Sequence, residues 1–286
     1  MINLYDYITD SRMFKKFQLD DLLFVEYHCF IEDLKSGFWT PCNYLIYILT
    51  GKKRWRSLDR EYFGKPGDAL FLKKGAYVVE QFLDEEFCSL IIFLPDDFIR
   101  TVMQNHSLRN PGKTIDVKEE PVFWVNVNPI LKSYFHSILS YFPQQQPPPD
   151  PLLKVKFEEF VINILSNTQN PPLASYFEQV CSNSKISIRE IMEANFAFNM
   201  NLEEFAKLSG RSLSTFHRDF KKEFETPPGK WLTRRRLEHA KLLLETTDKS
   251  VNEIAFDSGF ENPSHFIRAF KDKYDNTPLK FRQAAT

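Results

Sequence analysis

The spacing of apolar residues changes along the chain, and the change predicts two kinds of structure. Between residues 22 and 93, short runs rich in aromatic and β-branched residues are separated by turn formers such as Pro66-Gly67-Asp68 and Lys74-Gly75, a pattern typical of β-strands. After residue 95, apolar residues recur at intervals of three and four, which is typical of helices with one buried face. The chain is therefore expected to be α+β overall, with an all-β barrel or sandwich followed by helices.

The expected strands lie at residues 22–31, 44–49, 53–57, 69–72, 77–82 and 87–93. The second of these is apolar at every position from Tyr44 to Leu49, so it is expected to be buried on both faces. Helices are expected at residues 96–103, 128–142 and 150–166. The last helix carries an apolar stripe that includes Phe157 and Phe160. Two interpretations of this stripe remain open, because it can pack on the barrel or form a dimer contact.

One pattern occurs twice in the C-terminal part of the chain. The run from Phe216 to Lys221 returns about fifty residues later as the run from Phe266 to Lys271, and the segments before the two runs match as well. Phenylalanines four positions apart share one face of a helix, so the residues between them are expected to turn outward. The chain therefore contains an internal duplication.

Each copy has the residues that begin and end two short helices. A polar N-cap residue followed three positions later by Glu opens the first helix, and a glycine stands where its C-terminus requires a left-handed residue. A second polar N-cap then opens the second helix. These positions are Asn201, Glu204, Gly210 and Ser212 in the first copy, and Ser250, Glu253, Gly259 and Asn262, followed by Pro263, in the second. Both copies are therefore expected to form helix-turn-helix units, whose second helix is shaped to enter a major groove.

With these spacings, residues 187–283 resemble the double helix-turn-helix domain of AraC-type (arabinose-regulator) bacterial transcription factors. Two departures stand out. Pro263 opens the second recognition helix where family members often carry a polar reader, and Glu225 and Asp275 follow the recognition helices where the family usually has glycine. The matching positions are Ala206, Gly210, Phe216, Arg218, Phe220, Lys221, Arg236, Leu237, Ala240, Leu243, Leu244, Ile254, Ala255, Gly259, Phe260, Phe266, Arg268, Phe270, Lys271, Thr277, Pro278 and Arg282.

The resemblance implies that the chain binds double-stranded DNA. The positions that match base readers are Ser214, His217, Arg218, Pro263, Ser264, His265, Ile267 and Arg268. Phosphate contacts are expected from Ser212, Thr215, Lys221, Lys222, Arg235 and Lys271. The chemistry agrees for the arginines, since a guanidinium can grip O6 and N7 of guanine, whereas an isoleucine can touch only a thymine methyl group. The alternative is that these are ordinary solvated side chains.

A single helix is expected to join the two helix-turn-helix units at residues 229–245. It would be about 25 Å long, enough to hold the recognition helices near one turn of DNA, about 34 Å, apart. Arg234, Arg235 and Arg236 lie on it. One of them can reach phosphate, while a structural salt bridge is an equal alternative for Arg236.

Residues 51–75 resemble the small cupin-like barrel that AraC-type proteins carry at the N-terminus. That resemblance implies a sensor and dimerisation domain. Aromatic residues that could line an effector pocket are Tyr27, Tyr44, Trp55, Phe71 and Tyr77, although strand aromatics equally form a core. Residues 73–78 also resemble the barrel of secretion-system activators in the same family, which answer to a protein partner. A small-molecule effector and a protein effector therefore both remain open.

Composition and charge change this picture only slightly. The 286 residues carry a net charge of −1, with 18 Lys/Arg against 15 Asp/Glu from residue 184 onward, which suits DNA binding without requiring it. The four cysteines form no CxxC pair, and no basic leader or run of 18 apolar residues occurs, so a cytoplasmic protein outside the membrane is expected. A cupin enzyme with a DNA-binding tail is the alternative of another class. It would need clustered histidines, but only His28 falls among the strands, so no metal, cofactor or enzymatic activity is expected.

The sequence thus predicts a sensor and dimerisation domain at residues 1–183, with the barrel at about 20–95 and helices at about 96–181, a hinge at 182–185, and a DNA-binding domain at residues 184–286. The predicted function is a sequence-specific transcription regulator that acts as an activator. Its expected partners are DNA, a second copy of the chain, RNA polymerase, and an effector that is a small molecule or a protein.

Overall fold

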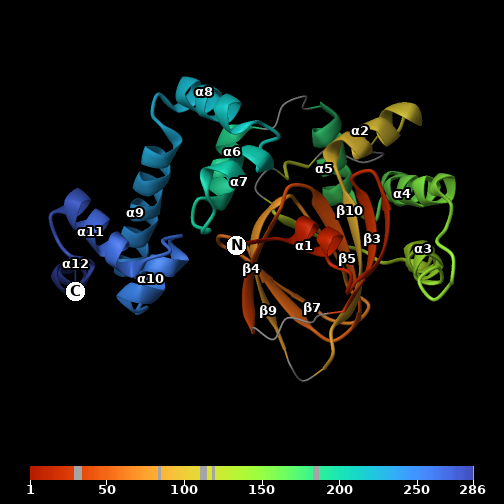
Figure 1. The fold of residues 1–286 in the computed structure, drawn as a ribbon, viewed down its shortest axis with the longest axis horizontal. Coiled ribbons are helices and arrows are strands. Elements are labelled where there is room, and N and C mark those ends of the chain that lie inside the picture. The colour runs from red at the N-terminus through yellow and green to blue at the C-terminus, as the bar shows by residue number, and fades with distance from the viewer. Residues whose placement is uncertain (29–33, 83–84, 110–114, 118–119, 183–186, 286) are drawn as a thin grey trace. The chain divides into compact units, whose positions relative to one another are not determined.

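Two compact units make up the chain, residues 2–185 and residues 186–286. Figure 1 shows them in a computed structural model that describes residues 1–28, 34–82, 85–109, 115–117, 120–182 and 187–285. The first unit contains two β-sheets with helices, and the described part of the second contains helices without strands. The expected α+β class is confirmed. Most of the hinge expected at residues 182–185 lies outside the described residues.

In the part of the chain that the structure describes, the strands form two sheets. One has the order β1 (Ile2–Asn3), β4 (Lys35–Thr40), β9 (Gly75–Gln81), β6 (Lys53–Arg56) and β7 (Glu61–Gly64). The other has the order β11 (Val122–Val125), β8 (Ala69–Leu72), β5 (Asn43–Thr50), β10 (Cys88–Leu94), β3 (Leu22–His28) and β2 (Lys15–Leu19). Described residues make no pairing between the sheets, so the expected barrel is not closed. The sheets enclose a shared core, as in a sandwich (Figure 1).

The sheet that contains β5 is buried on both faces. In β5, Tyr44, Ile46 and Ile48 point into the core between the sheets, whereas Leu45 and Tyr47 point toward the helices on the other side. This alternation follows from the two-residue period of a strand. The prediction that this strand is buried on both faces is confirmed.

Helices cover the outer face of this sheet. Three expected helices are present as α2 (Asp96–Asn105), α3 (Pro129–Leu139) and α4 (Asp150–Leu165), and α5 (Pro171–Ser182) joins them. In α4, Phe157 stacks on Phe24 of β3 with ring centroids 3.8 Å apart, and Phe160 packs beside Tyr134 of α3. Most of the apolar stripe of α4 is therefore buried by packing within the unit, which agrees with the first of the two interpretations that the sequence left open, while Val155 stays exposed.

Several short elements were not expected from the sequence. They include α1 (Leu4–Asp10), β1, β2, β4, β7 and β11. The strand β4 begins Lys35-Ser36-Gly37, a polar start containing glycine, and β7 has only four residues, so neither has a strand pattern of its own. Pairing with neighbours makes them strands, since β4 lies along β9 and β7 along β6.

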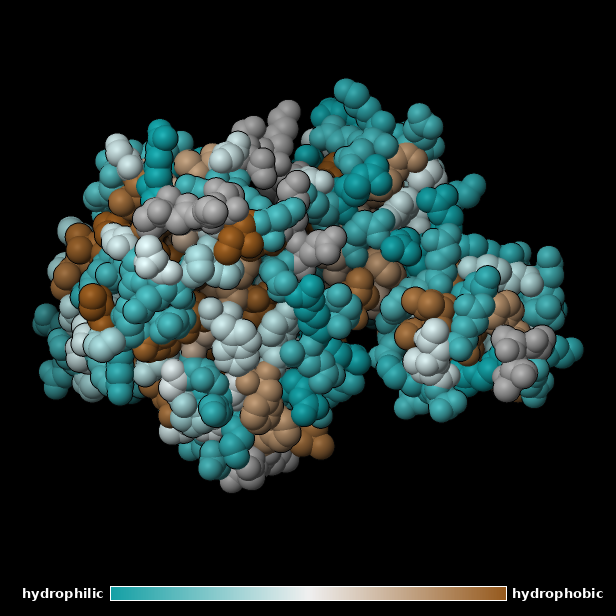
Figure 2. Space-filling view, turned by 180° about the vertical axis from the view of Figure 1, so that it is seen from behind, coloured by the Kyte–Doolittle hydropathy of each residue, from teal (hydrophilic) through white to brown (hydrophobic). Residues whose placement is uncertain are grey.

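The second unit consists of short helices in its described residues. They are α6 (Ile188–Asn195), α7 (Leu202–Leu208), α8 (Leu213–Phe224), α9 (Pro228–Thr246), α10 (Val251–Asp257), α11 (Pro263–Tyr274) and α12 (Pro278–Ala285). Large exposed apolar side chains are scattered over α8, α9, α10 and α12 as Leu213, Leu242, Phe256 and Leu279. On the face of the molecule in Figure 2, hydrophobic side chains likewise interrupt a mainly hydrophilic surface only in patches. None of the described helices is long and apolar enough to cross a membrane.

A buried asparagine joins the sheet to the helices of the first unit. Asn43, fully buried at the start of β5, donates to the Leu94 carbonyl and to Asp96 at the first turn of α2. Its side-chain oxygen accepts from the Lys74 backbone N–H at 3.1 Å and from the Tyr176 hydroxyl of α5 at 2.8 Å. All four hydrogen bonds that an amide side chain can make are therefore formed, and Lys74 also forms an ion pair with Asp96.

Replacing Asn43→Ala is expected to lower the free energy of unfolding of the first unit by about 3 kcal/mol, because it leaves buried polar partners without a hydrogen bond. The measurement is urea unfolding followed by the fluorescence of Trp39 and Trp55, both buried in this unit. Asn167→Ala is the matched control, since Asn167 accepts a single hydrogen bond from the neighbouring Gln169 backbone on the surface. Equal losses in the two variants would contradict a special role for Asn43.

Candidate nucleic-acid interface

The duplicated segments form two helix-turn-helix units, α7–α8 and α10–α11. Both first helices begin with the expected capping box, in which the N-cap side chain accepts from the backbone N–H of the Glu and the Glu carboxylate accepts from the N-cap backbone N–H. The turns contain Gly210 at φ 66° and Gly259 at φ 83°, in the left-handed region that favours glycine. Ser212 and Asn262 cap the second helices as expected, with Pro263 in the first turn.

The second helices bury one face each and expose the other. Phe216, Phe220, Phe266 and Phe270 are all fully buried, so the positions between them turn toward solvent. Both helices end at a left-handed residue other than glycine, Glu225 at φ 55° and Asp275 at φ 57°. The departure from the family's usual glycine therefore leaves the turn geometry itself in place.

The expected base readers differ in how far their side chains are exposed to solvent. Ser214, His217 and Arg218 on α8, and Ser264, His265 and Arg268 on α11, are exposed. Pro263 and Ile267 are only half-exposed. Ile267 packs against the buried core of the second helix-turn-helix unit, which leaves less of its side chain for a thymine methyl group.

The expected phosphate contacts fall into three groups. Lys221, Lys222 and Lys271 are exposed near the C-terminal ends of the two recognition helices. Ser212 and Thr215 are bonded to each other at the start of α8, where the Ser212 hydroxyl caps the helix. The assignment of these five residues to DNA phosphate stays a prediction.

Arg235 differs from the other expected phosphate contacts. Its Nε lies 2.9 Å from a Glu193 carboxylate oxygen of α6, and its guanidinium lies over the Phe196 ring. Arg235 is therefore already engaged in holding α6 against α9, and the expectation that it meets DNA phosphate gains no support from its position.

Among the residues that the structure describes, Arg236 has no partner for the salt bridge that was one alternative for it. Its Nε donates to the Phe196 carbonyl at 2.7 Å, and its Nη2 donates to the carbonyls of Phe198 and Met200. Burial lowers the pKa of Arg236 to about 10, so the guanidinium stays charged at neutral pH. It thus donates to three backbone carbonyls of the loop between α6 and α7.

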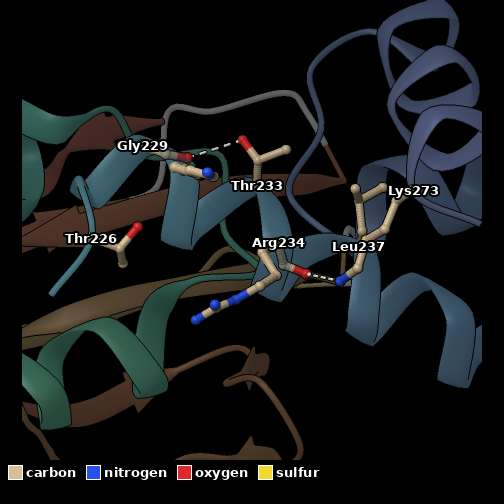
Figure 3. Close-up of a pocket in the computed structure, with 7 residues that line it drawn as sticks. Thr226, Gly229, Thr233, Arg234, Leu237 and Lys273 are labelled. Carbon is tan, nitrogen blue, oxygen red and sulfur yellow. Dashed lines mark hydrogen bonds between the residues drawn. The ribbon is translucent and has the colours of Figure 1, made fainter. Parts of the chain in front are cut away.

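The helix α9 is the rod that joins the two helix-turn-helix units. Its 19 residues from Pro228 to Thr246 extend one residue beyond the prediction at each end. A hollow of about 560 Å³ lies along it, lined by Thr226, Gly229, Lys230, Thr233, Arg234, Leu237 and Lys273 (Figure 3). There Lys273 of α11 donates to the Arg234 carbonyl at 3.2 Å and pairs with Glu238 at 3.0 Å. These contacts tie the C-terminal end of the second recognition helix to the rod.

Two charged residues beside Arg218 were missed by sequence reasoning. Asp219 lies between Arg211 of the turn and Arg218, with N–O distances of 3.3 Å to each. Desolvation acts to raise the pKa of Asp219, but the hydrogen bonds and charges of Arg211 and Arg218 outweigh it and hold that pKa below its ordinary value. The signal available in the sequence was the difference between the copies, because the positions of Arg211 and Asp219 are Phe260 and Ala269 in the second.

The expected effector residues are buried in the first unit, but not together. Tyr27, Tyr44, Trp55 and Tyr77 belong to the core between the sheets, whereas Phe71 packs on the helix side against Tyr176 and Phe177. The expectation that Phe71 shares a pocket with the others is therefore wrong. Tyr27, Tyr44 and Trp55 line a cavity of only about 20 Å³, which has room for about one water molecule.

One cluster in the sheets has the residue types of a nucleophilic site. Cys88 Sγ lies 3.7 Å from His28 Nε2, and His28 Nδ1 lies 3.6 Å from Glu86. Burial, together with the charges of Glu26 and Glu86, raises the pKa of the Cys88 thiol to about 11. The sulfur is therefore a thiol at neutral pH, and a thiol is a poor nucleophile compared with a thiolate.

Replacing Gly259→Ala is expected to destabilise the second unit by about 3 kcal/mol, since it combines a left-handed backbone with a steric clash. A Cβ at this position would lie 2.8 Å from Arg236 Nε and 2.9 Å from the Ala197 carbonyl oxygen. Gly67→Ala is the control, because Gly67 is also left-handed but a Cβ there meets nothing within 4 Å. Thermal unfolding measures both. A similar small loss in each variant would show that the clash is relieved without cost.

Two family descriptions match most of the chain. The ExsA N-terminal regulatory domain matches residues 43–176, and a helix-turn-helix domain matches residues 205–284. The first match runs from the start of β5 into α5, and leaves out α1 and β1–β4. The second covers both duplicated units and the rod between them.

Relatives extend the likeness along the chain. The virulence regulon transcriptional activator VirF of Yersinia enterocolitica is 25% identical over 239 residues, which are 83% of this chain and 88% of that protein. The HTH-type transcriptional regulator ExsA of Pseudomonas aeruginosa is 25% identical over 237 residues, 82% of this chain and 84% of its own. The transcriptional activator RhaS of Klebsiella pneumoniae is 38% identical over 92 residues, about a third of each protein.

Among solved structures, an apo form of a ToxT variant from Vibrio cholerae aligns with 93% of this chain and 98% of its own at 14% identity, with a TM-score of 0.43, too low to establish a shared arrangement. The match to a helix-turn-helix family and the sequence likeness to these regulators agree with the duplicated motif, and the chain belongs to the AraC-type family of transcription regulators.

Proposed function

We propose that the chain activates transcription by placing α8 and α11 in successive major grooves of one DNA site. The observation that carries this is the repetition of one surface: each recognition helix exposes an arginine at the same position, Arg218 and Arg268, between two buried phenylalanines. An arginine at such a position can read guanine with two hydrogen bonds. The half-exposed Pro263 and Ile267 make the second helix the less polar reader of the two.

The rod α9 sets the spacing of the two recognition helices. A helix of this length spans about 28 Å, close to the roughly 34 Å repeat of DNA over which successive major grooves face one side. Arg236 fixes the α6–α7 loop on the rod, and Lys273 fixes α11 on it. Because both recognition helices are anchored to a single rigid helix, they would meet the DNA in a fixed register.

For the first unit, we propose regulation by a protein partner. The core between the sheets is filled with its own side chains, leaving a cavity of about 20 Å³, whereas small-molecule pockets measure about 300–1,000 Å³. The match to the ExsA N-terminal regulatory domain supports a regulatory role for this unit. As an activator, the chain would also contact RNA polymerase. We further propose that it is a cytoplasmic homodimer without enzymatic activity. The dimer contact would lie elsewhere than the buried stripe of α4.

Replacing Arg218→Ala is expected to weaken binding to the selected DNA site by about 1–3 kcal/mol and to change non-specific binding much less. Lys221→Ala, on the same helix, should weaken both equally and reduce the salt dependence by about one phosphate contact. The measurement is selection of bound DNA fragments followed by titration at several salt concentrations. Equal losses of specific and non-specific binding in Arg218→Ala would reassign Arg218 to phosphate.

Transcription from a selected site should be activated by the purified chain and RNA polymerase without any added small molecule. The chain is first unfolded in denaturant, dialysed and refolded, so that any bound small ligand is removed. Activation only after adding the low-molecular-mass fraction of a cell extract would contradict the proposed protein effector. Unchanged DNA binding by the refolded chain is the control that the second unit has recovered its structure.

A further inference from the structure

Asp219 holds a place in the first helix-turn-helix unit that has no counterpart in the second. Its carboxylate lies 3.3 Å from Arg211 Nε through one oxygen and 3.3 Å from Arg218 Nε through the other. In the second unit the three positions are occupied by Phe260, Ala269 and Arg268. Arg268 has no ion pair within 4 Å among the residues that the structure describes. The duplicated units therefore support their exposed arginines in different ways.

Arg211, Asp219 and Arg218 form a bridge of two ion pairs, and Arg211 anchors its inner end. Arg211 donates its backbone N–H to the Ala206 carbonyl at 2.9 Å and its Nη1 to the Ser209 carbonyl at 2.8 Å, so its side chain is fixed to the end of α7. The fraction of the side chain that is exposed rises outward, from 16% for Arg211 to 35% for Asp219 and 75% for Arg218. A fixed arginine thus holds a half-buried carboxylate, which in turn touches the exposed arginine.

The bridge leaves Arg218 able to read a base. Asp219 accepts from Nε of Arg218, while the two terminal amino groups of a guanidinium remain for O6 and N7 of guanine. A planar guanidinium held at one edge loses less rotational freedom on binding than one that is free in solvent.

We propose that Asp219 is a positioning residue for base recognition, orienting Arg218 for the half-site read by α8, while the half-site read by α11 depends on an arginine without such support. This proposal rests on the proposed function, since it requires that Arg218 reads a base. The carboxylate acts through Arg218 and does not itself touch DNA. The two half-sites are then read with unequal stringency.

The test compares full-length variants by selection of bound DNA fragments and by the ratio of specific to non-specific affinity. Asp219→Ala should lower that ratio by about 3- to 10-fold, a fraction of the discrimination that one bidentate arginine provides. The loss should fall on the base positions that Arg218→Ala also affects. Non-specific affinity should rise, because a negative charge is removed from a surface that faces phosphate.

Asp272→Ala is the matched control. Asp272 is an exposed carboxylate on α11, and it has no ion pair within 4 Å in the described part of the chain. Its removal changes the net charge equally and should raise affinity for all sequences without changing the motif. If Asp219→Ala behaves like Asp272→Ala, Asp219 is only a surface charge and the proposal is overturned.

The double variant Arg218→Ala with Asp219→Ala separates positioning from a direct role. If Asp219 acts through Arg218, the double variant should lose no more specificity than Arg218→Ala alone. A larger loss would overturn the proposal. Asp219→Asn keeps the shape of the side chain, so it should fold as the unchanged protein does and still relax the α8 half-site in part. An unchanged motif in that variant would equally count against the bridge.

The same experiment distinguishes failure of the bridge from failure of the proposed function. If Arg218→Ala leaves the motif intact, Arg218 is not a base reader, and the assignment on which the bridge depends falls with it. If no motif is selected by the unchanged protein, sequence-specific binding itself fails. If Arg218→Ala alters the motif and Asp219→Ala does not, only the bridge is wrong.

Discussion

One partly buried guanidinium connects the parts of the helical unit. Arg236 lies on the rod and donates to carbonyls of the α6–α7 loop, which leads into the first helix-turn-helix unit. The glycine turn of the second unit approaches the same place, because a Cβ on Gly259 would collide with Arg236 and with the Ala197 carbonyl. Both units and the rod therefore meet at one charged group. Its partial burial is tolerated because its N–H groups donate to three backbone carbonyls of that loop.

Duplication has kept the framework of the two units and changed their surfaces. The caps, the glycine turns and the buried phenylalanine pairs are alike in both. On the surface, the first unit has a row of alternating charges around Asp219. The second unit has Pro263 at the start of its second helix, and its Ile267 packs partly against the core. Local backbone requirements restrict the framework positions, while the outward positions are free to diverge.

The sequence was most informative where structure depends on neighbours along the chain. Helix caps such as Asn201 and Ser250 and turn glycines such as Gly210 act within a few residues, so their spacing predicted the helix-turn-helix units. The strands β4 and β7 were not predicted, because pairing with neighbouring strands, and not their own residue pattern, makes them strands. The position of Phe71 was mispredicted for a related reason. The alternation of side chains along a strand shows which residues share a face of the sheet, but not which face packs against the helices.

The environment of the charged residues was equally hidden from the sequence. Arg235 and Arg236 are adjacent and of one type, yet one pairs with Glu193 of a distant helix and the other with backbone carbonyls. Nothing local separates them. The comparison of the two copies was the exception, because differences between Arg211 and Phe260, and between Asp219 and Ala269, mark positions where similar folds have different surfaces.

The four bonds of Asn43 bear on how the first unit opens. This side chain belongs to β5, and its partners belong to the end of β10, the turn before β9, and the helices α2 and α5. Helix α5 cannot lift off without leaving a buried amide oxygen with one partner fewer. The helix and the sheet would therefore exchange their amide hydrogens as one cooperative block. Opening of α5 from its C-terminal end at Ser182 would therefore stop at the Tyr176 hydroxyl.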